Sequence, residues 1–396
     1  MKPDRDIKKL KVLIVGAGAY VAGRGTSSYG TILPALNELY KKGLIHSITI
    51  AATHSKSIID LKKKVAQLRS LTNSNIPIEG VPKQGQDSSS YKKALKASTY
   101  DCAILVVPDH LHYSIGADLI QSGLPTLIVK PLTPTVQEAR KLIQYAKSQN
   151  IYTAVEFHKR YDSANLKLKE VISDGRLGDI LYINVEYSQR RINPLKTFKN
   201  WIAHTNIFQY LGVHYVDIIY FVTGAKPLRV LAMGQKNLLK QHGIDNYDSI
   251  EVLIEWQHGK NKFVSTFLTN WIDPNTTSAM SDQKIKVIGT MGRYESDQKN
   301  RGVQLVTEQD GIEDINPYFT QSYPSMNEAG KTFKGYGIES VMQFCRDVAD
   351  IQSGQVKVRD LENKRPTFKD ALVSTAVVEA VNKSLKEKSV WVDVTM

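Results

Sequence analysis

Cysteine is scarce in this chain. Its 396 residues include only two, Cys102 and Cys345, too few for a disulfide framework. Cys102 also falls within an apolar segment that predicts a buried strand. The sequence therefore excludes a disulfide-stapled secreted domain and favours a reducing cytoplasm.

Long apolar runs are missing as well. The run at residues 12–15 is far too short for a signal peptide or a membrane span. No later segment approaches the ~20 apolar residues that a spanning helix needs. We expect a cytoplasmic protein with no membrane partner and no metal.

Basic residues exceed acidic ones, 52 to 39, which gives a net charge of +13. Such a surface attracts nucleic acid, anionic membranes or phosphorylated small molecules. The lysines are dispersed, however, and the densest clusters (8–11 and 62–64) lack interleaved aromatic residues. We therefore expect a small-molecule substrate and no nucleic acid, although charge alone keeps a nucleic-acid-associated protein as a distant alternative.

The length and the pattern indicate two domains. Buried strands alternate with amphipathic helices through residue 157, and this alternation predicts a doubly wound parallel sheet. We therefore expect a dinucleotide-binding Rossmann domain over residues 1–157. Strands are expected at 11–15, 48–53, 76–81, 102–107, 126–129 and 152–157, and helices at 58–71, 88–97, 110–122 and 136–148.

From residue 158 the pattern changes to longer alternating segments separated by Gly, Asn and Asp turns. It predicts an α+β domain over 158–396 with a mostly antiparallel, open sheet. Strands are expected at 181–188, 229–233, 249–256, 262–270, 284–288 and 303–307, and helices at 162–173, 337–351 and 368–385. The two late helices are expected to pack back on the core and close one sheet face. The other face needs a cover, so we expect a homodimer or homotetramer.

A glycine-rich turn follows the first strand, GAGAYVAGRG at residues 16–25. Gly16 and Gly18 suit a tight turn that brings backbone N–H groups toward a pyrophosphate at a helix N-terminus. The third fingerprint position is Val21 instead of Gly or Ala, and clear helical periodicity begins only near Thr31. Gly23 is expected to take over the packing role in a longer loop. The motif predicts a nicotinamide dinucleotide.

The turn after the second strand bears on the choice between NAD and NADP. NAD enzymes usually place Asp or Glu here, on the ribose hydroxyls. This chain has Thr53, His54, Ser55 and Lys56, with no acid before Asp60. A neutral-to-basic turn tolerates a 2′-phosphate, so NADP is expected to compete at least equally with NAD. The alternative is an ordinary polar loop.

Residues 101–132 read as strand, turn, helix and strand, and end on Lys130-Pro131. Ligands of doubly wound sheets bind beyond the carboxyl ends of the strands, where residues 108–112 and Lys130 fall. A lysine that closes a buried strand loses solvation and needs a partner or a task. The alternative is a side chain that only snorkels to solvent.

A third candidate group lies in the second half. Tyr210, His214 and Asp217 stand at i, i+4 and i+7 of a predicted helix and share one face. The histidine can take a hydroxyl proton, and the aspartate can hold its ring. A histidine satisfied within the core is the alternative.

Six motifs occur in the order typical of one family: GAGAYVAGRG, VVPDHLHY, IVKPLTPTVQEA, EFHKRYD, GRLGDI and GVHYVDIIYFVTG. With the closing segment RPTFKDALVSTAVVEAVNKS, the chain resembles the glucose-fructose oxidoreductase / inositol dehydrogenase / rhizopine catabolism (Gfo/Idh/MocA) family over essentially its full length. The resemblance implies NAD(P), a sugar or cyclitol substrate that meets the cofactor between the two domains, and dimers or tetramers built through the sheet.

The resemblance also implies roles. Lys130 would hydrogen-bond the reacting oxygen, and His214 would donate or accept the proton. Many members carry Asp four residues before that histidine, where this chain has Tyr210, so the tyrosine either replaces the acid or leaves His214 as the sole proton carrier. A catalytically silent, cofactor-binding regulator or scaffold is the alternative function.

The candidate site residues follow from these arguments. Catalytic roles are predicted for Lys130, His214 and Tyr210. Cofactor contacts are predicted for Gly16, Gly18, Ala19, Tyr20, Val21, Thr53, His54, Ser55, Lys56, Val107, Pro108, His112, Lys130, Pro131 and His158. Substrate contacts are predicted for Lys130, Arg160, Arg190, Arg191, Trp201, Tyr210, His214, Asp217 and Asn270. Arg190 and Arg191 could equally be solvated charges at a strand end.

Overall fold

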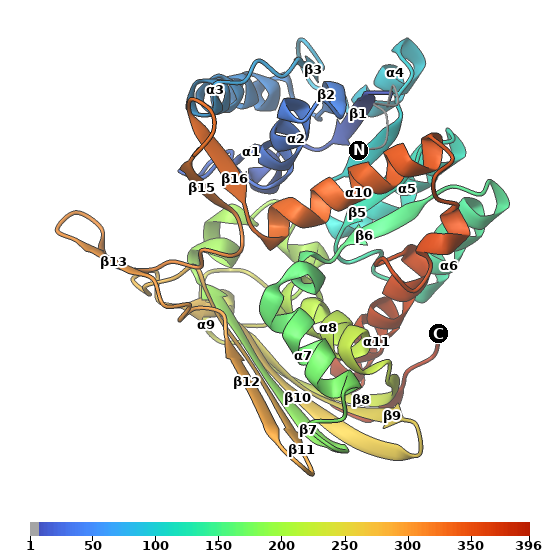
Figure 1. Cartoon of the computed structure of the whole chain (residues 1–396). Helices are drawn as coiled ribbons and strands as arrows, with labels where there is room; N and C mark the ends of the chain where they lie inside the picture. Colours follow the sequence, from blue (N-terminus) through green and yellow to red (C-terminus); the bar gives the residue numbers. More distant parts are fainter. Residues whose placement is uncertain (1–7) are drawn as a thin grey trace. The chain divides into compact units, whose positions relative to one another are not determined.

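A computed structural model describes residues 8–396 and divides into two compact units (Figure 1). The first unit takes in the described residues up to Val129, then Arg140–Tyr161 and Tyr318–Lys369. The second comprises Lys130–Ala139, Asp162–Pro317 and Asp370–Met396. The chain therefore enters each unit more than once. The sequence placed one boundary at residue 157 and assigned all later residues to the second domain.

The first unit is built on a six-stranded parallel sheet in the order β3-β2-β1-β4-β5-β6. Its strands are β1 (Leu10–Val15), β2 (Ile45–Ala51), β3 (Ile78–Val81), β4 (Cys102–Leu105), β5 (Thr126–Val129) and β6 (Thr153–Glu156). The order reverses between β1 and β4, and this is the switch point beyond which doubly wound sheets bind their ligands. The predicted Rossmann fold is confirmed.

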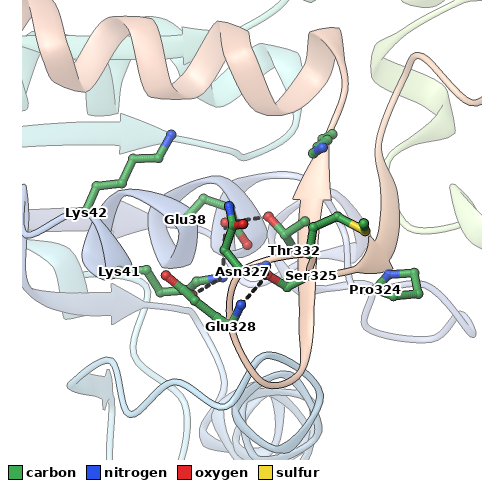
Figure 2. A pocket seen from close by; sticks show the side chains of 10 residues that line it. Glu38, Lys41, Lys42, Pro324, Ser325, Asn327, Glu328 and Thr332 are labelled. Atoms are coloured by element: carbon green, nitrogen blue, oxygen red, sulfur yellow. Dashed lines mark hydrogen bonds and ion pairs between the residues drawn. The ribbon is translucent and has the colours of Figure 1, made fainter.

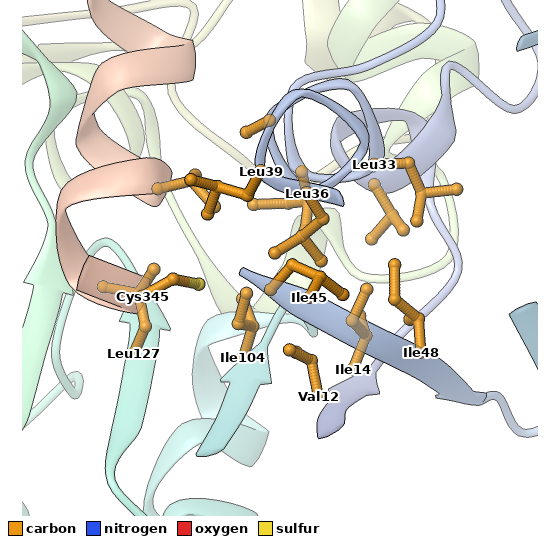
Figure 3. Close-up of a cluster of buried hydrophobic side chains, with 14 of the residues drawn as sticks. Val12, Ile14, Leu33, Leu36, Leu39, Ile45, Ile48, Ile104, Leu127 and Cys345 are labelled. Carbon is orange, nitrogen blue, oxygen red and sulfur yellow. The ribbon is translucent and has the colours of Figure 1, made fainter. Parts of the chain in front are cut away.

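The helices of this unit pack apolar faces on the sheet. They are α1 (Ala19–Ala22), α2 (Ile32–Lys41), α3 (Ser55–Thr72), α4 (Ser90–Ala97), α5 (His112–Gln121), most of α6 (Val136–Ser148), and α10 (Tyr336–Gln352). In Figure 3, Leu36 and Leu39 of α2 meet Ile14 and Ile45 of the sheet, and Cys345 of α10 joins the same cluster. Burial of such side chains contributes about 1.5–3 kcal/mol each.

Helix α10 corrects one prediction. The sequence expected it to close a face of the antiparallel sheet, but it belongs to the first unit. Its apolar face places Val341, Phe344 and Val348 in the core formed with β1 and α2. Periodicity showed that this helix had a buried face, but it could not show which sheet that face covers.

The second unit contains a seven-stranded sheet in the order β12-β11-β7-β10-β9-β8-β17. Its strands are β7 (Ile180–Arg190), β8 (Lys226–Gln235), β9 (Ser249–His258), β10 (Asn261–Asp273), β11 (Ser281–Gly289), β12 (Arg293–Asp297) and β17 (Val392–Asp393). All neighbours pair antiparallel except β7 and β10, which pair parallel. The predicted mostly antiparallel α+β architecture is confirmed.

Helices cover one face of this sheet (Figure 1). They are α7 (Ser163–Ser173), α8 (Val213–Thr223) and α11 (Phe368–Lys386), and the short α9 (Leu238–Gln241) lies in the connection from β8 to β9. Ser384 of α11 accepts a hydrogen bond from the backbone of Ala232 at 3.0 Å. The opposite face presents apolar side chains, with Leu268 47% and Met233 51% exposed.

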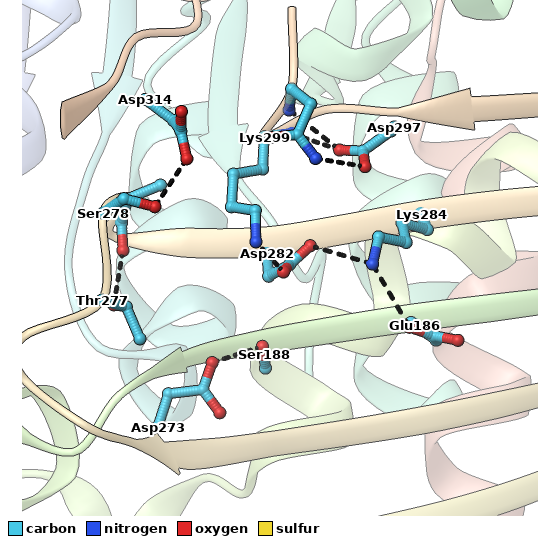
Figure 4. Close-up of polar contacts among 12 residues, drawn as sticks. Glu186, Ser188, Asp273, Thr277, Ser278, Asp282, Lys284, Asp297, Lys299 and Asp314 are labelled. Carbon is cyan, nitrogen blue, oxygen red and sulfur yellow. Dashed lines mark hydrogen bonds and ion pairs between the residues drawn. The ribbon is translucent and has the colours of Figure 1, made fainter. Parts of the chain in front are cut away.

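The predicted strand at 303–307 is not part of the large sheet. Residues Gln304–Thr307 form β13, which pairs only with β14 (Gly311–Asp314) in a separate hairpin. The backbone leaves β12 in a turn that Asp297 closes, accepting from the N–H groups of Lys299 and Asn300 (Figure 4). Lys299 donates to Asp282 of β11 at 2.6 Å. This polar turn redirects the chain away from the sheet.

A second hairpin, β15 (Gln321–Pro324) and β16 (Lys331–Lys334), belongs to the first unit. The backbone N–H of Phe333 donates to the buried carboxylate of Glu38 on α2 at 3.0 Å. No helix among residues 8–396 combines the length and the apolar character that crossing a bilayer requires.

Candidate active site

The glycine-rich turn lies directly after β1. Gly16 has φ 117°, and a Cβ there would lie 1.9 Å from the carbonyl oxygen of Val106 beyond β4, so only glycine fits. Gly18 precedes α1, and a Cβ built on it would meet no atom within 4 Å. One glycine thus closes the switch point tightly, and the other leaves space beside the backbone where a pyrophosphate can approach.

The longer loop explains why the third fingerprint position can be a valine. Val21 is fully buried within α1, which ends after one turn. Gly23 has φ 69° and approaches Ser28 so closely that a Cβ would lie 1.8 Å from its carbonyl oxygen. Gly30, also at positive φ, packs on the backbone of Ala19. Gly23 therefore allows close packing within the loop itself, and Gly30, which the sequence did not single out, allows it against α1. That Gly23 takes over the role of the third fingerprint glycine stays a prediction.

The turn after β2 is polar and carries no carboxylate. Thr53, His54 and Lys56 are exposed, and His54 precedes the first turn of α3. Ser55 donates its backbone N–H to Gly85 at 2.9 Å. Arg24 reaches this region from the glycine loop and donates to the Ser57 hydroxyl at 2.6 Å. Sequence reasoning missed Arg24.

A cluster of polar and aromatic side chains lies at the carboxyl end of β6. His158 Nδ1 lies 2.9 Å from a carboxylate oxygen of the fully buried Glu156 and 3.3 Å from the Tyr20 hydroxyl. The His158 ring stacks on Tyr336 of α10 at 5.7 Å between centroids. The pKa of the Tyr20 phenol is raised well above its ordinary value, mainly because the group is buried and also because the negative charge of Glu156 lies nearby. Two predicted cofactor residues, Tyr20 and His158, therefore lie together.

His112 opens α5 and is almost fully buried. Its Nε2 lies 2.9 Å from the carbonyl oxygen of Val107, which fixes the segment of Val107 and Pro108 after β4. Because a carbonyl can only accept, Nε2 carries the proton in this contact. These residues of the predicted set stabilise the turn next to Gly16.

Lys130 follows the last residue of β5 and is only 9% exposed. Its Nζ donates to the backbone carbonyl of Tyr210. The same ammonium lies 3.8 Å from the centroid of the Tyr210 ring, a close cation–π contact. Pro131 follows in a cis peptide bond. Two of the three predicted catalytic residues are therefore in direct contact.

His214 and Asp217 lie on α8, 3% and 2% exposed. The ring of His214 lies 6.3 Å from that of Tyr187 on β7. The predicted helix is present but begins as a π-helical turn, Phe208–Gly212, that precedes α8. Tyr210 lies in that turn, so the spacing from Tyr210 to His214 spans the change of helix type. Such π-helical turns are frequent at functional sites.

The predicted substrate residues have mixed environments. Arg190 donates to the Thr277 hydroxyl and to the Ala279 carbonyl, both at 3.1 Å, and so secures the turn after β10. Arg191 bonds the carbonyl of Asp273 in the same turn. Asn270 caps a local turn by accepting from the N–H of Ile272. These contacts give the three residues structural tasks.

Trp201 and Arg160 differ from that group. Trp201 is half-buried and lies 6.0 Å from the Tyr210 ring, and Phe198 lies 4.9 Å from the same ring and 4.6 Å from Trp201. Sequence reasoning missed Phe198. Arg160 is 7% exposed and belongs to the first unit, with its guanidinium 5.9 Å from the Phe157 ring. Lys130, Tyr210 and Trp201 thus form one group, whereas Arg160 lies in the other unit.

A pocket of about 250 Å³ lies in the first unit between α2 and the β15–β16 hairpin (Figure 2). It is lined by Glu38, Lys41, Lys42, Pro324, Ser325, Met326, Asn327, Glu328, Thr332 and Lys334. None of the predicted site residues lines it. Lys41 bridges Glu38 and Glu328 at 3.4 Å each, so the polar groups largely satisfy one another. Among residues 8–396, no group of three or more His, Cys, Asp or Glu side chains could hold a metal ion.

Comparison with known protein families assigns both parts of the chain. Residues 10–157 match the model described as an oxidoreductase family with an NAD-binding Rossmann fold, and residues 165–295 match the Gfo/Idh/MocA C-terminal domain. The chain belongs to the Gfo/Idh/MocA oxidoreductase family. The predicted family and the predicted nicotinamide-binding domain are confirmed.

Individual relatives are distant. An inositol 2-dehydrogenase of Rhizobium meliloti is 22% identical over 74% of this chain and 80% of its own length. The NADP(+) scyllo-inositol 2-dehydrogenase of Bacillus subtilis is 32% identical over 30% of this chain. The chain spans about a third of the length of several curated relatives that it matches. The structure of scyllo-inositol dehydrogenase from Lactobacillus casei with NAD(H) and scyllo-inositol has a TM-score of 0.67 at 16% identity, covering 98% of this chain and 99% of that one, which shows the shared fold.

The residues of the glycine turn fit a dinucleotide. The open space beside Gly18 and the start of a helix at Ala19 leave backbone N–H groups directed at a ligand after β1. The positive φ at Gly16 keeps the turn tight against β4. The turn at Gly16–Gly18 would therefore hold the pyrophosphate of NAD.

Proposed function

We propose that this member of the Gfo/Idh/MocA family is an NAD(P)-dependent dehydrogenase that interconverts a hydroxyl and a keto group on a sugar, a sugar derivative or a cyclitol. The observation that supports it most is Lys130, a buried lysine at the carboxyl end of a Rossmann strand whose ammonium is held by Tyr210. Burial of an ammonium is costly unless hydrogen bonds or charges compensate for its lost hydration, and the contacts with Tyr210 keep this one oriented where the reacting oxygen of a substrate is expected. The names of the relatives support a polyhydroxylated ring as substrate.

When bound, NAD(P) supplies the hydride acceptor or donor. A carbinol carbon releases a hydride readily only as the proton of its hydroxyl group is removed, so the site needs a base and a group that stabilises negative charge on the oxygen. His214 takes or returns the proton, because a histidine titrates near neutral pH. Lys130 donates a hydrogen bond to the reacting oxygen. Acid–base help contributes typically ~10²–10⁴ in rate, and one oriented oxyanion donor ~10²–10³.

We further infer that NADP competes with NAD, because the turn from Thr53 to Lys56 holds no carboxylate and Arg24 reaches the same region. The apolar outer face of the large sheet supports a homodimer or homotetramer built through it. Cys102 and Cys345 are buried free thiols, which fits the reducing cytoplasm.

The test compares matched variants of the full chain. Purified protein is incubated with NAD or NADP and a panel of inositols, sugars and nucleotide sugars, and nicotinamide absorbance is followed. We expect turnover with at least one ring substrate, and Lys130→Met and His214→Asn should each lower kcat at least ~10²-fold while cofactor affinity changes little. Lys169→Met is the control, because Lys169 also contacts an aromatic ring, Phe221 at 3.9 Å, but is no site residue.

Two results would reject the proposal. Full activity in both the Lys130 and the His214 variants would reject the proposed mechanism. Tight cofactor binding without turnover on any substrate of the panel would favour the alternative, a cofactor-binding regulator or scaffold.

A further inference from the structure

Tyr210 contacts Lys130 through two groups, neither of which is its hydroxyl. The Lys130 ammonium donates to the backbone carbonyl of Tyr210 and lies 3.8 Å from the centre of its ring. The face of an aromatic ring is negative and attracts a cation. A lysine has a flexible four-carbon stem, so two contacts from one residue restrict the direction of the charge at its end.

The Tyr210 ring is itself held by other aromatic rings. Phe198 packs edge-on against it at 4.9 Å, and Trp201 lies edge-on at 6.0 Å. Behind Phe198 lies the fully buried Trp271, at 6.4 Å, whose indole N–H donates to the carbonyl of Tyr247 at 2.7 Å. The backbone of Tyr210 belongs to the π-helical turn before α8. Both the ring and the carbonyl that face Lys130 are therefore fixed.

We propose that Tyr210 is a positioning residue for Lys130, acting through its ring and its backbone carbonyl. This inference rests on the proposed role of Lys130 as hydrogen-bond donor to the substrate oxygen. It favours the interpretation in which His214 carries the proton, because a ring and a carbonyl that orient Lys130 give Tyr210 a task that needs no hydroxyl. The ring also keeps water from one side of the ammonium.

The first experiment needs no substrate. Native protein is treated with acetic anhydride at limiting concentration, and the acetylation rate of each lysine is measured by peptide mass spectrometry. We compare the parent with Tyr210→Phe, which keeps the ring, and Tyr210→Leu, which removes it. Phe221→Leu is the matched control, because it removes the ring beneath Lys169 in the same unit.

We expect Lys130 to react about tenfold faster in Tyr210→Leu and at the parental rate in Tyr210→Phe, with Lys169 unchanged in both. Phe221→Leu should accelerate Lys169 and leave Lys130 unchanged. Equal rates for Lys130 in the parent and Tyr210→Leu would overturn the proposal, whatever the protein turns out to catalyse. If Tyr210→Leu does not fold, acceleration of Lys130 in Tyr210→Phe would overturn it too.

The second experiment uses a substrate that the parent turns over. Tyr210→Leu should lower kcat about tenfold with an unchanged KM for the cofactor, and Tyr210→Phe should recover most of that loss. The pH profile of kcat/KM should keep both limbs in Tyr210→Phe, because no essential acid has been removed. A Phe variant as impaired as the Leu variant, or one that loses a limb, would show that the hydroxyl acts as the acid and would refute the proposal. Absence of turnover in the parent would count against the proposed function only, since the acetylation rates test the contact independently.

Discussion

Removal of the basic side chains near the start of α3 should change cofactor preference. Arg24 comes from the glycine loop and bonds Ser57 in the first turn of α3, and the exposed Lys56 lies in the same turn. Neither residues 53–54 before the helix nor its first turn contain an acidic residue. A 2′-phosphate that enters this region would meet two cations and the positive end of an 18-residue helix.

The size of the effect follows from the hydrogen bonds. A hydrogen bond to a charged group contributes about 1.5–3 kcal/mol, and each 1.4 kcal/mol is a factor of ten in affinity. Arg24→Ala should therefore weaken NADP binding by about 10- to 150-fold and leave NAD binding nearly unchanged. Lys56→Asp should shift the ratio further, because it replaces an attractive charge with a repulsive one.

The assay is titration of NADPH and NADH fluorescence at low and high salt, since exposed charges are screened at high ionic strength. Lys64→Ala is the control. Lys64 bonds the carbonyls of Thr26 and Ser28 at 2.7 and 2.8 Å and so fixes the same loop without facing the α3 turn. It should weaken both cofactors alike. An unchanged ratio of NADP to NAD affinity in both Arg24→Ala and Lys56→Asp would refute the reasoning.

Three further predictions concern the scaffold. Gly16→Ala should lower the melting temperature, because its Cβ would lie 1.9 Å from the Val106 carbonyl, whereas Gly18→Ala, with no atom within 4 Å, should fold normally and weaken cofactor binding. Light scattering at micromolar concentration should give a mass above that of a monomer, and Leu268→Lys on the exposed sheet face should reduce it; a monomeric parent would reject the assembly. The Lys93 side chain, then Ser89, lowers the pKa of Asp87 to about 2. Because the unfolded value is near ~3.9, this carboxylate stabilises the fold fully above about pH 4 and progressively less as the pH falls toward 2; an Asp87 pKa near 4 by NMR would contradict this.

The fold could be predicted largely because its signals are local. The strands β1, β4 and β5 are almost wholly buried and read as short apolar runs, as at Ile104 and Leu105. Helices with an apolar face alternate with the strands along the chain. The sequence could not show which sheet the apolar face of each helix packs against. Helix α10 has the same kind of amphipathic pattern as α11, yet Val341 and Cys345 pack with the Rossmann core. Similarly, the apolar pair Leu305 and Val306 is typical of a strand, but the two side chains remain 45% and 64% exposed in a separate hairpin.

Some residues of the candidate site could likewise be predicted from their spacing in the sequence, whereas the orientation of others depends on how the folded chain packs. Gly16 and Lys130 could be found because each stands at a fixed position relative to a strand end. Tyr210 was found only as a departure from the family pattern, and its hydroxyl was the natural focus because proton transfer is the task of the missing aspartate. The structure brings its ring and its carbonyl to Lys130 instead. That orientation depends on Phe198 and on a π-helical turn, and neither has a signature in residue spacing. The tyrosine thus fixes the neighbouring charge through its ring and its carbonyl, two groups whose direction only the folded chain determines.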